Sequence, residues 1–284
     1  MFKNLLQLTL VVVLFTVPES VFAVERDINK EFKIDGGSLD VNINILAGEL
    51  EIIPSGTKSE LKVTAGYDDK YCDIKFDYNI RTNTVTIATD YEKSKNLDCH
   101  DRNDKGVKIS VELPYNPEID LDIESTAGNI DIQLGDLSLK NFDIKHVAGD
   151  LDLDFNKPNR ITLGTFDIDC TAGNIDLKNL GNAHFGNVSI NNNAGQLSVD
   201  FSGDILEDVN AYIDNNVGGM DITIPKKVGT KMEINQNTFL NPEKQYRSFE
   251  KKGSSYYSDN YDNSDTLLSL NVSAVLGNVD VRMK

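Results

Sequence analysis

Thr171-Ala-Gly-Asn-Ile-Asp-Leu177 is a clear copy of a short motif that returns along the chain: a small or apolar residue, a glycine, one further residue and then alternating apolar positions. The other copies are Leu46–Ile52, Thr126–Ile132, Val147–Leu153, Asn193–Val199, Asn216–Ile222 and Val275–Val281. In the central run, successive motif glycines are 21, 24, 22 and 23 residues apart: Gly128, Gly149, Gly173, Gly195 and Gly218. Self-similarity at a period of this size is typical of a solenoid, in which each repeat is one coil.

Each repeat holds three short segments in which apolar and polar residues alternate. In the first repeat they lie at Ile130–Leu134, Leu137–Leu139 and Phe142–Ile144. Such alternation predicts strands with one buried and one solvated face. Three strands in about 22 residues predict an all-β fold, a parallel β-helix, because each strand can bond only to its equivalents in the neighbouring coils. The motif glycine would allow a tight corner without a Cβ.

Two regions interrupt this period in a domain predicted to cover residues 24–284. Residues 54–113 contain four strand-like segments, two of them joined by a short polar turn at Arg81–Thr84, and are expected to form a hairpin-rich side element. Residues 235–266 are polar and are expected to form a long hairpin or loop. We therefore treat both regions as insertions in one solenoid.

The first 23 residues differ from the rest of the chain. Lys3 precedes the apolar stretch Leu5–Val17, Pro18 breaks it, and Val21–Ala23 offers small residues at a cleavage site. This pattern predicts a secretory signal peptide over residues 1–23. The stretch is too short for a helix that crosses a bilayer of about 30 Å. We expect an exported protein, periplasmic, on the cell surface or secreted, and not an integral membrane protein.

Charge and cysteine content restrict the partners and the compartment. The 284 residues include 45 Asp and Glu against 28 Lys and Arg, a net charge of −17, which argues against nucleic acid and anionic membranes as partners. An oxidising compartment permits disulfides, and Cys72 and Cys99 are expected to pair because they flank the same hairpin. Cys170 is then left over and is expected to be a small buried apolar residue.

Several of these features together resemble a known family. The signal peptide, the turn at Leu113-Pro114, the recurring Ala-Gly-Asn-Ile-Asp and the closing Leu276–Val281 are similar to the bacterial putative-adhesin β-strand-repeat family, a group of domains of unknown function akin to toast-rack and head-GIN adhesin-like domains. The resemblance covers nearly all of the chain after residue 23. It implies a single-stranded right-handed β-helix in an envelope-exposed or secreted protein, and it carries over no catalytic residue.

One outward position of the repeats carries carboxylates. Its members are Asp131, Asp152, Asp176, Ser198, Asp221 and Asp280. Stacked in register, neighbours would lie about 4.8 Å apart, and a calcium ion could relieve their repulsion. The alternative is a solvated polar face whose repulsion is screened by salt. Asp131, Asp152 and Asp176 are thus metal candidates, with calcium as the ion.

Two further groups are candidates for binding. His146 and Cys170 occupy one corner position of adjacent repeats, where they could hold a transition metal or simply join a column of small and polar side chains with Asn192 and Asn215. Tyr246, Tyr256, Tyr257 and Tyr261 lie among small polar residues, a composition suited to recognition of protein or glycan. The alternative for these tyrosines is an insertion without a binding role.

No catalytic signature is found in the sequence. A nucleophile elbow, metal-ligand spacing and a phosphate-binding loop are all missing. We therefore expect a non-catalytic, adhesin-like β-helix protein without a cofactor, which acts as a binding or scaffolding surface for an envelope or extracellular protein or glycan. The alternatives are a polysaccharide lyase or hydrolase built on a β-helix, and a purely structural part of an envelope complex.

Overall fold

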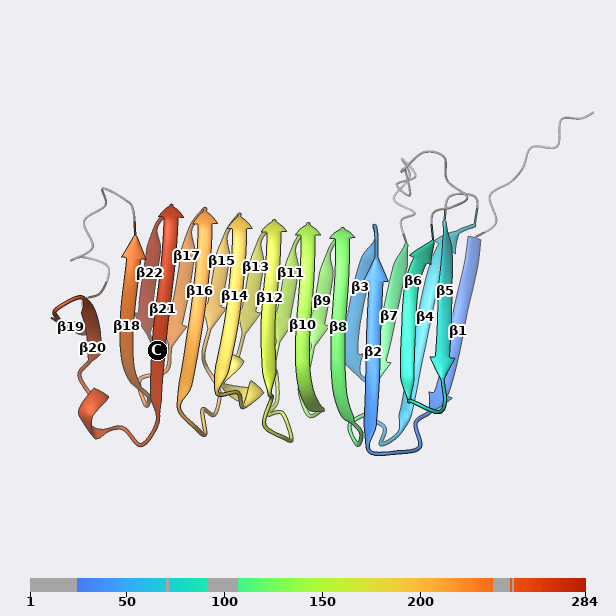
Figure 1. Ribbon diagram of the computed structural model, residues 1–284, viewed down its shortest axis with the longest axis horizontal. Helices are drawn as coiled ribbons and strands as arrows, with labels where there is room; N and C mark the ends of the chain where they lie inside the picture. The colour runs from blue at the N-terminus through green and yellow to red at the C-terminus, as the bar shows by residue number, and fades with distance from the viewer. Residues whose placement is uncertain (1–24, 70–71, 91–106, 237–245, 247) are drawn as a thin grey trace, which may run out of the picture.

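The chain folds into two large β-sheets in the computed structural model, which describes residues 25–69, 72–90, 107–236, 246 and 248–284. The strands run across the long axis of the molecule in two rows, one behind the other (Figure 1). The protein is therefore all-β, as expected. No helix in the described part is both long and apolar enough to span a membrane. The predicted signal peptide, residues 1–23, lies outside the described residues.

We call the row at the back of Figure 1 sheet A. Its ten strands are, in spatial order, β1 (Glu25–Lys33), β4 (Glu60–Asp68), β7 (Lys108–Leu113), β3 (Glu49–Pro54), β9 (Ile130–Gln133), β11 (Leu151–Asp154), β13 (Ile175–Lys178), β15 (Leu197–Asp200), β17 (Met220–Ile224) and β22 (Val279–Met283).

The row at the front is sheet B. Its twelve strands are, in spatial order, β19 (Phe249–Lys252), β20 (Ser255–Ser258), β18 (Gly229–Gln236), β21 (Leu267–Leu276), β16 (Val209–Val217), β14 (Asn187–Ala194), β12 (Thr165–Ala172), β10 (Ser138–Ala148), β8 (Glu118–Ala127), β2 (Ser38–Ile45), β6 (Thr84–Asp90) and β5 (Asp73–Asn79). Two short 3₁₀ segments, Leu180–Ala183 and Tyr261–Asn263, lie in the connections.

Successive repeats pair in parallel and in register. In sheet A, Ile130 lies opposite Leu151, Leu151 opposite Ile175, and so on through Leu197, Met220 and Val279. In sheet B, the strands from β8 to β16 and then β21 pair in the same way. The chain thus crosses from one sheet to the other within each repeat, and equivalent residues form columns along the molecule.

Each repeat supplies two main strands, not the three that alternation predicts. In the first repeat the second and third segments join in β10, with an irregularity in register between Leu139 and Asn141. In the next repeat the segment around Leu163 makes only an isolated bridge with Phe185. The short alternating segment around Leu163 therefore belongs to the connection between β11 and β12 and is not a strand.

The two interruptions of the period leave the stack continuous. Gly48 donates its N–H to the carbonyl of Ala127 at 3.0 Å across the first, and Gly218 donates to Leu276 at 2.8 Å across the second. The strands of residues 54–113 continue the two sheets: β7 and β4 extend sheet A, with β1 beyond them, and β6 and β5, which pair as the expected hairpin, extend sheet B. At the other end, β18 to β20 extend sheet B. These segments lengthen both sheets at one end of the stack and sheet B at the other.

The motif glycines approach each other closely. A Cβ on Gly128 would lie 1.7 Å from the carbonyl oxygen of Gly48, and a Cβ on Gly149 would lie 1.9 Å from that of Gly128. The same contact recurs at Gly173, Gly195, Gly218 and Gly277. The backbone at Gly149 has a φ of 132°, which L side chains rarely adopt. No other amino acid fits this corner unless the repeats separate.

The interior between the sheets is apolar. Every second residue of the repeat strands points inward and is buried. Phe142, Phe166 and Phe185 stack along the axis with ring centroids 5.3 Å apart at each step. Cys170 is buried in this core, as expected for a small apolar residue.

We predict that Gly149→Ala destabilises the protein by about 3 kcal/mol or more, because it adds both an unfavourable φ and a clash with backbone. The matched control is Gly37→Ala, since a Cβ at Gly37 meets nothing within 4 Å. Chemical denaturation of both variants measures the difference. Equal free energies of unfolding for the two variants would contradict the role of the glycine contact.

Candidate functional site

The outward carboxylates of sheet A form one column. Glu51 of β3 lies opposite Asp131, Asp131 opposite Asp152, and Asp152 opposite Asp176. The column continues through Ser198, Asp221 and Asp280. The register thus aligns these side chains as the repeat spacing predicts, and it adds Glu51, which occupies the same motif position in the copy at Leu46–Ile52.

Most of the repulsion in this column is balanced locally. Lys178 places its ammonium group between Asp152 and Asp176, with 3.0 Å to the Asp176 carboxylate. These contacts, the hydrogen bond to Asp152 above all, raise the pKa of Lys178. Asp221 accepts a hydrogen bond from the Gln196 amide at 3.0 Å, and Arg282 lies 3.4 Å from its other oxygen. Glu51 accepts a hydrogen bond from the Ser110 hydroxyl at 2.8 Å.

Asp131 differs from Asp152, Asp176 and Asp221, whose carboxylates have partners. Within the described part of the chain, its carboxylate makes no hydrogen bond or ion pair. Partial burial raises its pKa, and the neighbouring charges of Asp152 and then Glu51 raise it further. The negative potential of the column is therefore least balanced at Asp131.

Asp131 lies in a groove on the outer face of sheet A, with a volume of about 850 Å³. The groove extends over β1, β4, β7, β3, β9 and β11. Its charged lining residues are Asp27, Glu49, Glu51, Lys108, Asp131, Asp150 and Asp152. The single lysine, Lys108, is held by Glu49 at 2.9 Å. We call this feature the acidic groove, and its chemistry suits a positively charged ligand.

The carboxylates of the acidic groove are spread along strands and do not converge on a point. In the described residues, no group of three or more His, Cys, Asp or Glu side chains is close enough to hold a metal ion. A calcium site at Asp131, Asp152 and Asp176 remains a prediction, and Lys178 already holds two of its three proposed ligands. An extended cationic ligand matches the spread of charge better than a single ion.

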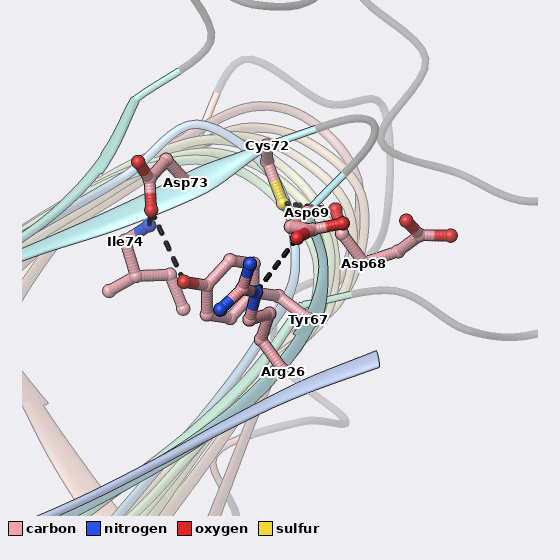
Figure 2. A network of polar contacts seen from close by, with 7 residues as sticks. All are labelled: Arg26, Tyr67, Asp68, Asp69, Cys72, Asp73 and Ile74. Atoms are coloured by element: carbon pink, nitrogen blue, oxygen red, sulfur yellow. Dashed lines mark hydrogen bonds and ion pairs between the residues drawn. The ribbon is translucent and has the colours of Figure 1, made fainter. Parts of the chain in front are cut away.

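A polar network holds the edge of the groove in place (Figure 2). Arg26, the residue before Asp27, contacts the Asp69 carboxylate at 2.7 Å. The Tyr67 hydroxyl donates to Asp73 at 3.2 Å, and the same Asp73 oxygen accepts the N–H of Ile74 at 3.0 Å. These contacts tie the start of β1 to the connection between β4 and β5, and so position Asp27.

Cys72 lies beside this network and is buried (Figure 2). Its sulfur is 3.8 Å from the carbonyl oxygen of Asp68. Cys99 lies outside the described residues, so the disulfide between Cys72 and Cys99 remains a prediction.

The four candidate tyrosines divide into two pairs at the far end of sheet B. Tyr246 is only 4% exposed; its hydroxyl reaches the carbonyl of Val279, and its ring packs against Tyr256 with centroids 5.0 Å apart. Tyr257 and Tyr261 meet edge to face at 4.9 Å and are half-buried. Tyr246 therefore packs at the end of the core and offers no surface for recognition. The polar residues around it in the sequence do not predict this buried position.

The structure also describes the corner column that contains His146 and Cys170. His146 is buried and lies in register between Ser125 and Cys170. Burial lowers its pKa, an effect that the nearby backbone of Gly149 and Ser125 partly opposes, and in the described part of the chain neither ring nitrogen makes a hydrogen bond of normal geometry. Farther along, the Asn192 amide donates to the Asn215 side chain at 3.2 Å, as the polar-column interpretation expects.

These features define an all-β repeat protein with stacked parallel strands and an exposed acidic face. The N-terminal domain of toast_rack, DUF2154, matches residues 18–164, just over half of the 284 residues, and the chain belongs to this family. The sequence matches no curated protein.

Three crystal structures of bacterial proteins align with this chain. A putative cell adhesion protein from Clostridium sporogenes aligns over 92% of this chain and 100% of its own at 16% identity, with a TM-score of 0.43. A putative adhesin from Bacteroides fragilis aligns over 90% and 97% at 13% identity, with a TM-score of 0.37. A putative adhesin from Parabacteroides merdae aligns over 90% and 96% at 14% identity, with a TM-score of 0.33.

We predict that Asp131→Asn raises the melting temperature at pH 7 by about 1–2 °C, because it removes an unbalanced charge from a partly screened site. Folding raises the pKa of the Asp131 carboxyl group above its ordinary value of 3.8. Ionisation of this group therefore lowers the stability of the folded protein as the pH rises above 3.8. The gain should therefore disappear in acid, where the wild-type carboxyl is also neutral. Thermal melts from pH 3 to pH 8 measure it.

The matched control is Asp176→Asn, which removes a carboxylate held by Lys178. We expect its melting temperature at pH 7 to be unchanged or lower. If both variants gain equally, the argument that the charge of Asp131 is less compensated than that of Asp176 is wrong.

For calcium, the column predicts a higher melting temperature in millimolar Ca²⁺ than in EDTA, because an ion that binds only the folded state stabilises it. Identical melts in the two buffers would dispose of the calcium site.

Proposed function

We propose that this protein is an exported, non-catalytic, adhesin-like binding or scaffolding protein whose acidic groove receives a positively charged segment of an envelope or extracellular protein. The observation that carries the proposal is the groove itself. Six carboxylates and one already paired lysine line a hollow of about 850 Å³. Attraction of such a surface for a basic segment is strong at low ionic strength and falls with salt.

The frame around the groove supports a binding role. We infer a right-handed β-solenoid over residues 24–284, interrupted at 54–113 and 235–266, in which parallel register holds every outward side chain at a fixed spacing. Groups held on strands need little ordering when a ligand binds, which favours affinity. The adhesion-related names of the structural relatives agree with a binding protein.

Export is proposed from residues 1–23, whose pattern is that of a signal peptide. Cleavage after Ala23 would release a chain that starts at Val24, in the periplasm, on the cell surface or in the medium. Recovery of the intact chain from Met1 in the cytoplasm would contradict this part of the proposal.

A lyase or hydrolase on the same scaffold would need an acid and a base placed around a bond. The carboxylates Asp152 and Asp176 are both engaged by Lys178, and Glu51 is engaged by Ser110. Asp131 has a raised pKa, but its neighbours in the column, Glu51 and Asp152, are the carboxylates that Ser110 and Lys178 already engage. This arrangement supports electrostatic binding over bond cleavage.

We predict that the full mature protein binds a fluorescein-labelled octalysine peptide at low salt and releases it as NaCl rises to about 0.3 M. The double variant Glu51→Gln, Asp131→Asn should bind about fivefold more weakly, the equivalent of about 1 kcal/mol for two exposed charge contacts. Fluorescence anisotropy measures both effects.

The control removes the same charge from the other face. Asp122 and Glu124 lie on the outer face of sheet B, in β8. Asp122→Asn, Glu124→Gln should leave the affinity for octalysine within about twofold. Equal losses in the two double variants would mean that the peptide senses only the net charge, and would overturn the assignment of the groove.

A further inference from the structure

A second hollow lies on the outer face of sheet B. Its strands β16, β21 and β18 are at the opposite end of the molecule from β1, β4 and β7, which line the acidic groove (Figure 1). It has a volume of about 440 Å³, within the roughly 300–1,000 Å³ of small-molecule sites. Its floor comes from β16, β21 and β18, and the turn between β19 and β20 contributes Ser254. The polar groups around it are those of Asp214, Glu233, Asn235, Asn271 and Ser273. We call it the Tyr212 groove, after the aromatic residue that it contains.

Tyr212 stands out on its face of the sheet. Its side chain is 55% exposed. Its neighbours in register are Ser189 on β14 and Asn271 on β21, both too short to cover a phenol ring. Farther along the column, the equivalent positions are Asp167 and Asp143. A large ring surrounded by short polar side chains leaves an apolar surface open to a ligand.

Two polar side chains of the Tyr212 groove, Asp214 and Asn271, have no partner among the described residues. On the rest of this face, equivalent residues pair with one another: Asn44 with Glu124, Asn191 with Asp169, and Asn210 with Asn187. In the groove, by contrast, none of the described side chains makes a hydrogen bond or ion pair with Asp214 or Asn271. Donors and acceptors around an open ring are therefore available to a ligand.

Glu233 closes one side of this arrangement. Its carboxylate contacts Lys231 at 2.7 Å and Ser255 at 3.2 Å, which links the floor of the groove to the β19–β20 hairpin. These two contacts, the one with Lys231 first, lower the pKa of Glu233. The carboxylate therefore stays ionised and accepts hydrogen bonds at neutral pH.

An exposed aromatic ring surrounded by hydrogen-bonding side chains is suited to binding a sugar. A pyranose ring offers a face of C–H groups that can lie on an aromatic ring, and a rim of hydroxyls that both donate and accept hydrogen bonds. Tyr, Asn and Ser supply those two kinds of contact at small cost in side-chain ordering. Asp214, Glu233 and the net charge of −17 repel anionic polysaccharides. A basic peptide would find one carboxylate already neutralised by Lys231.

We propose that the Tyr212 groove binds a neutral oligosaccharide, with Tyr212 as the platform for one sugar ring and with Asn271 and Asp214 holding its hydroxyls. The site extends the proposed binding role to the other sheet and does not rest on the acidic groove. Failure of octalysine binding and failure of glycan binding are thus separate results.

The test starts with the mature protein on an array of neutral and acidic glycans, followed by calorimetric titration with cellohexaose, maltohexaose, chitohexaose and hexagalacturonate. We expect binding to at least one neutral glycan and none to hexagalacturonate. Tyr212→Ala should weaken the neutral ligand at least about tenfold, and Tyr212→Phe, which keeps the ring, should stay within about threefold. Tyr212 is largely exposed, so both variants should keep the wild-type melting temperature.

The control is Tyr261→Ala, which removes a half-buried aromatic ring at the same end of the molecule but outside the groove lining. Its affinity should equal that of the wild type. An array without a bound neutral glycan, binding of acidic glycans alone, or a neutral ligand that Tyr261→Ala weakens and Tyr212→Ala does not, would each overturn the proposal.

Discussion

The contact on which the structure depends is that between the backbones of stacked glycines. Each motif glycine after the first presses against the carbonyl of the glycine before it, at a distance that excludes any Cβ. Because the same corner recurs at Gly48, Gly128 and through to Gly277, it sets one register for the whole stack, even where 80 residues separate two adjacent glycines in sequence. The next residue of the motif supports the corner: the Asn129 side chain accepts the N–H of Asp150, and Asp150 accepts that of Asn174.

Fixed register has an electrostatic consequence. A residue type that recurs at one motif position is necessarily stacked on its copies, so outward aspartates become a column of like charges about 4.8 Å apart. The chain compensates locally where a basic or amide side chain falls two positions from the column or one repeat away, as with Lys178, Arg282 and Gln196. Where the N-terminal copy brings Glu51 beside Asp131, no cation forms an ion pair with either carboxylate in the described part of the chain, and Lys178 offsets the charge of Asp131 only in part. The acidic groove is therefore a place where the repeat leaves negative charge incompletely compensated.

The sequence predicts the repeat, its glycine corners, the aligned carboxylates and the all-β class, because all of these follow from periodicity. It does not predict that two strands, not three, make each repeat, since the segments at Leu137–Leu139 and Phe142–Ile144 alternate equally well as one strand or as two. It also conceals the role of Tyr246, which lies in polar sequence yet closes the apolar core through long-range packing. Tyr212 has no local signal other than its outward position. The groove around Tyr212 forms only when β18 and the β19–β20 hairpin, which follow it in sequence, pack beside it.

The ends of the stack explain where binding can occur. Parallel strands stacked in register leave an unpaired edge at each end, which would invite further chains to add. Here β7, β4 and β1 continue sheet A and β6 and β5 continue sheet B at one end. At the other end β18 to β20 continue sheet B, and Tyr246 packs beside β22, the last strand of sheet A. These same additions create the hollows, because the acidic groove lies where β1, β4 and β7 join sheet A, and the Tyr212 groove lies where the hairpin joins sheet B. The segments that lengthen the sheets thus shape the two surfaces on which a ligand can rest, while the central repeats hold those surfaces apart.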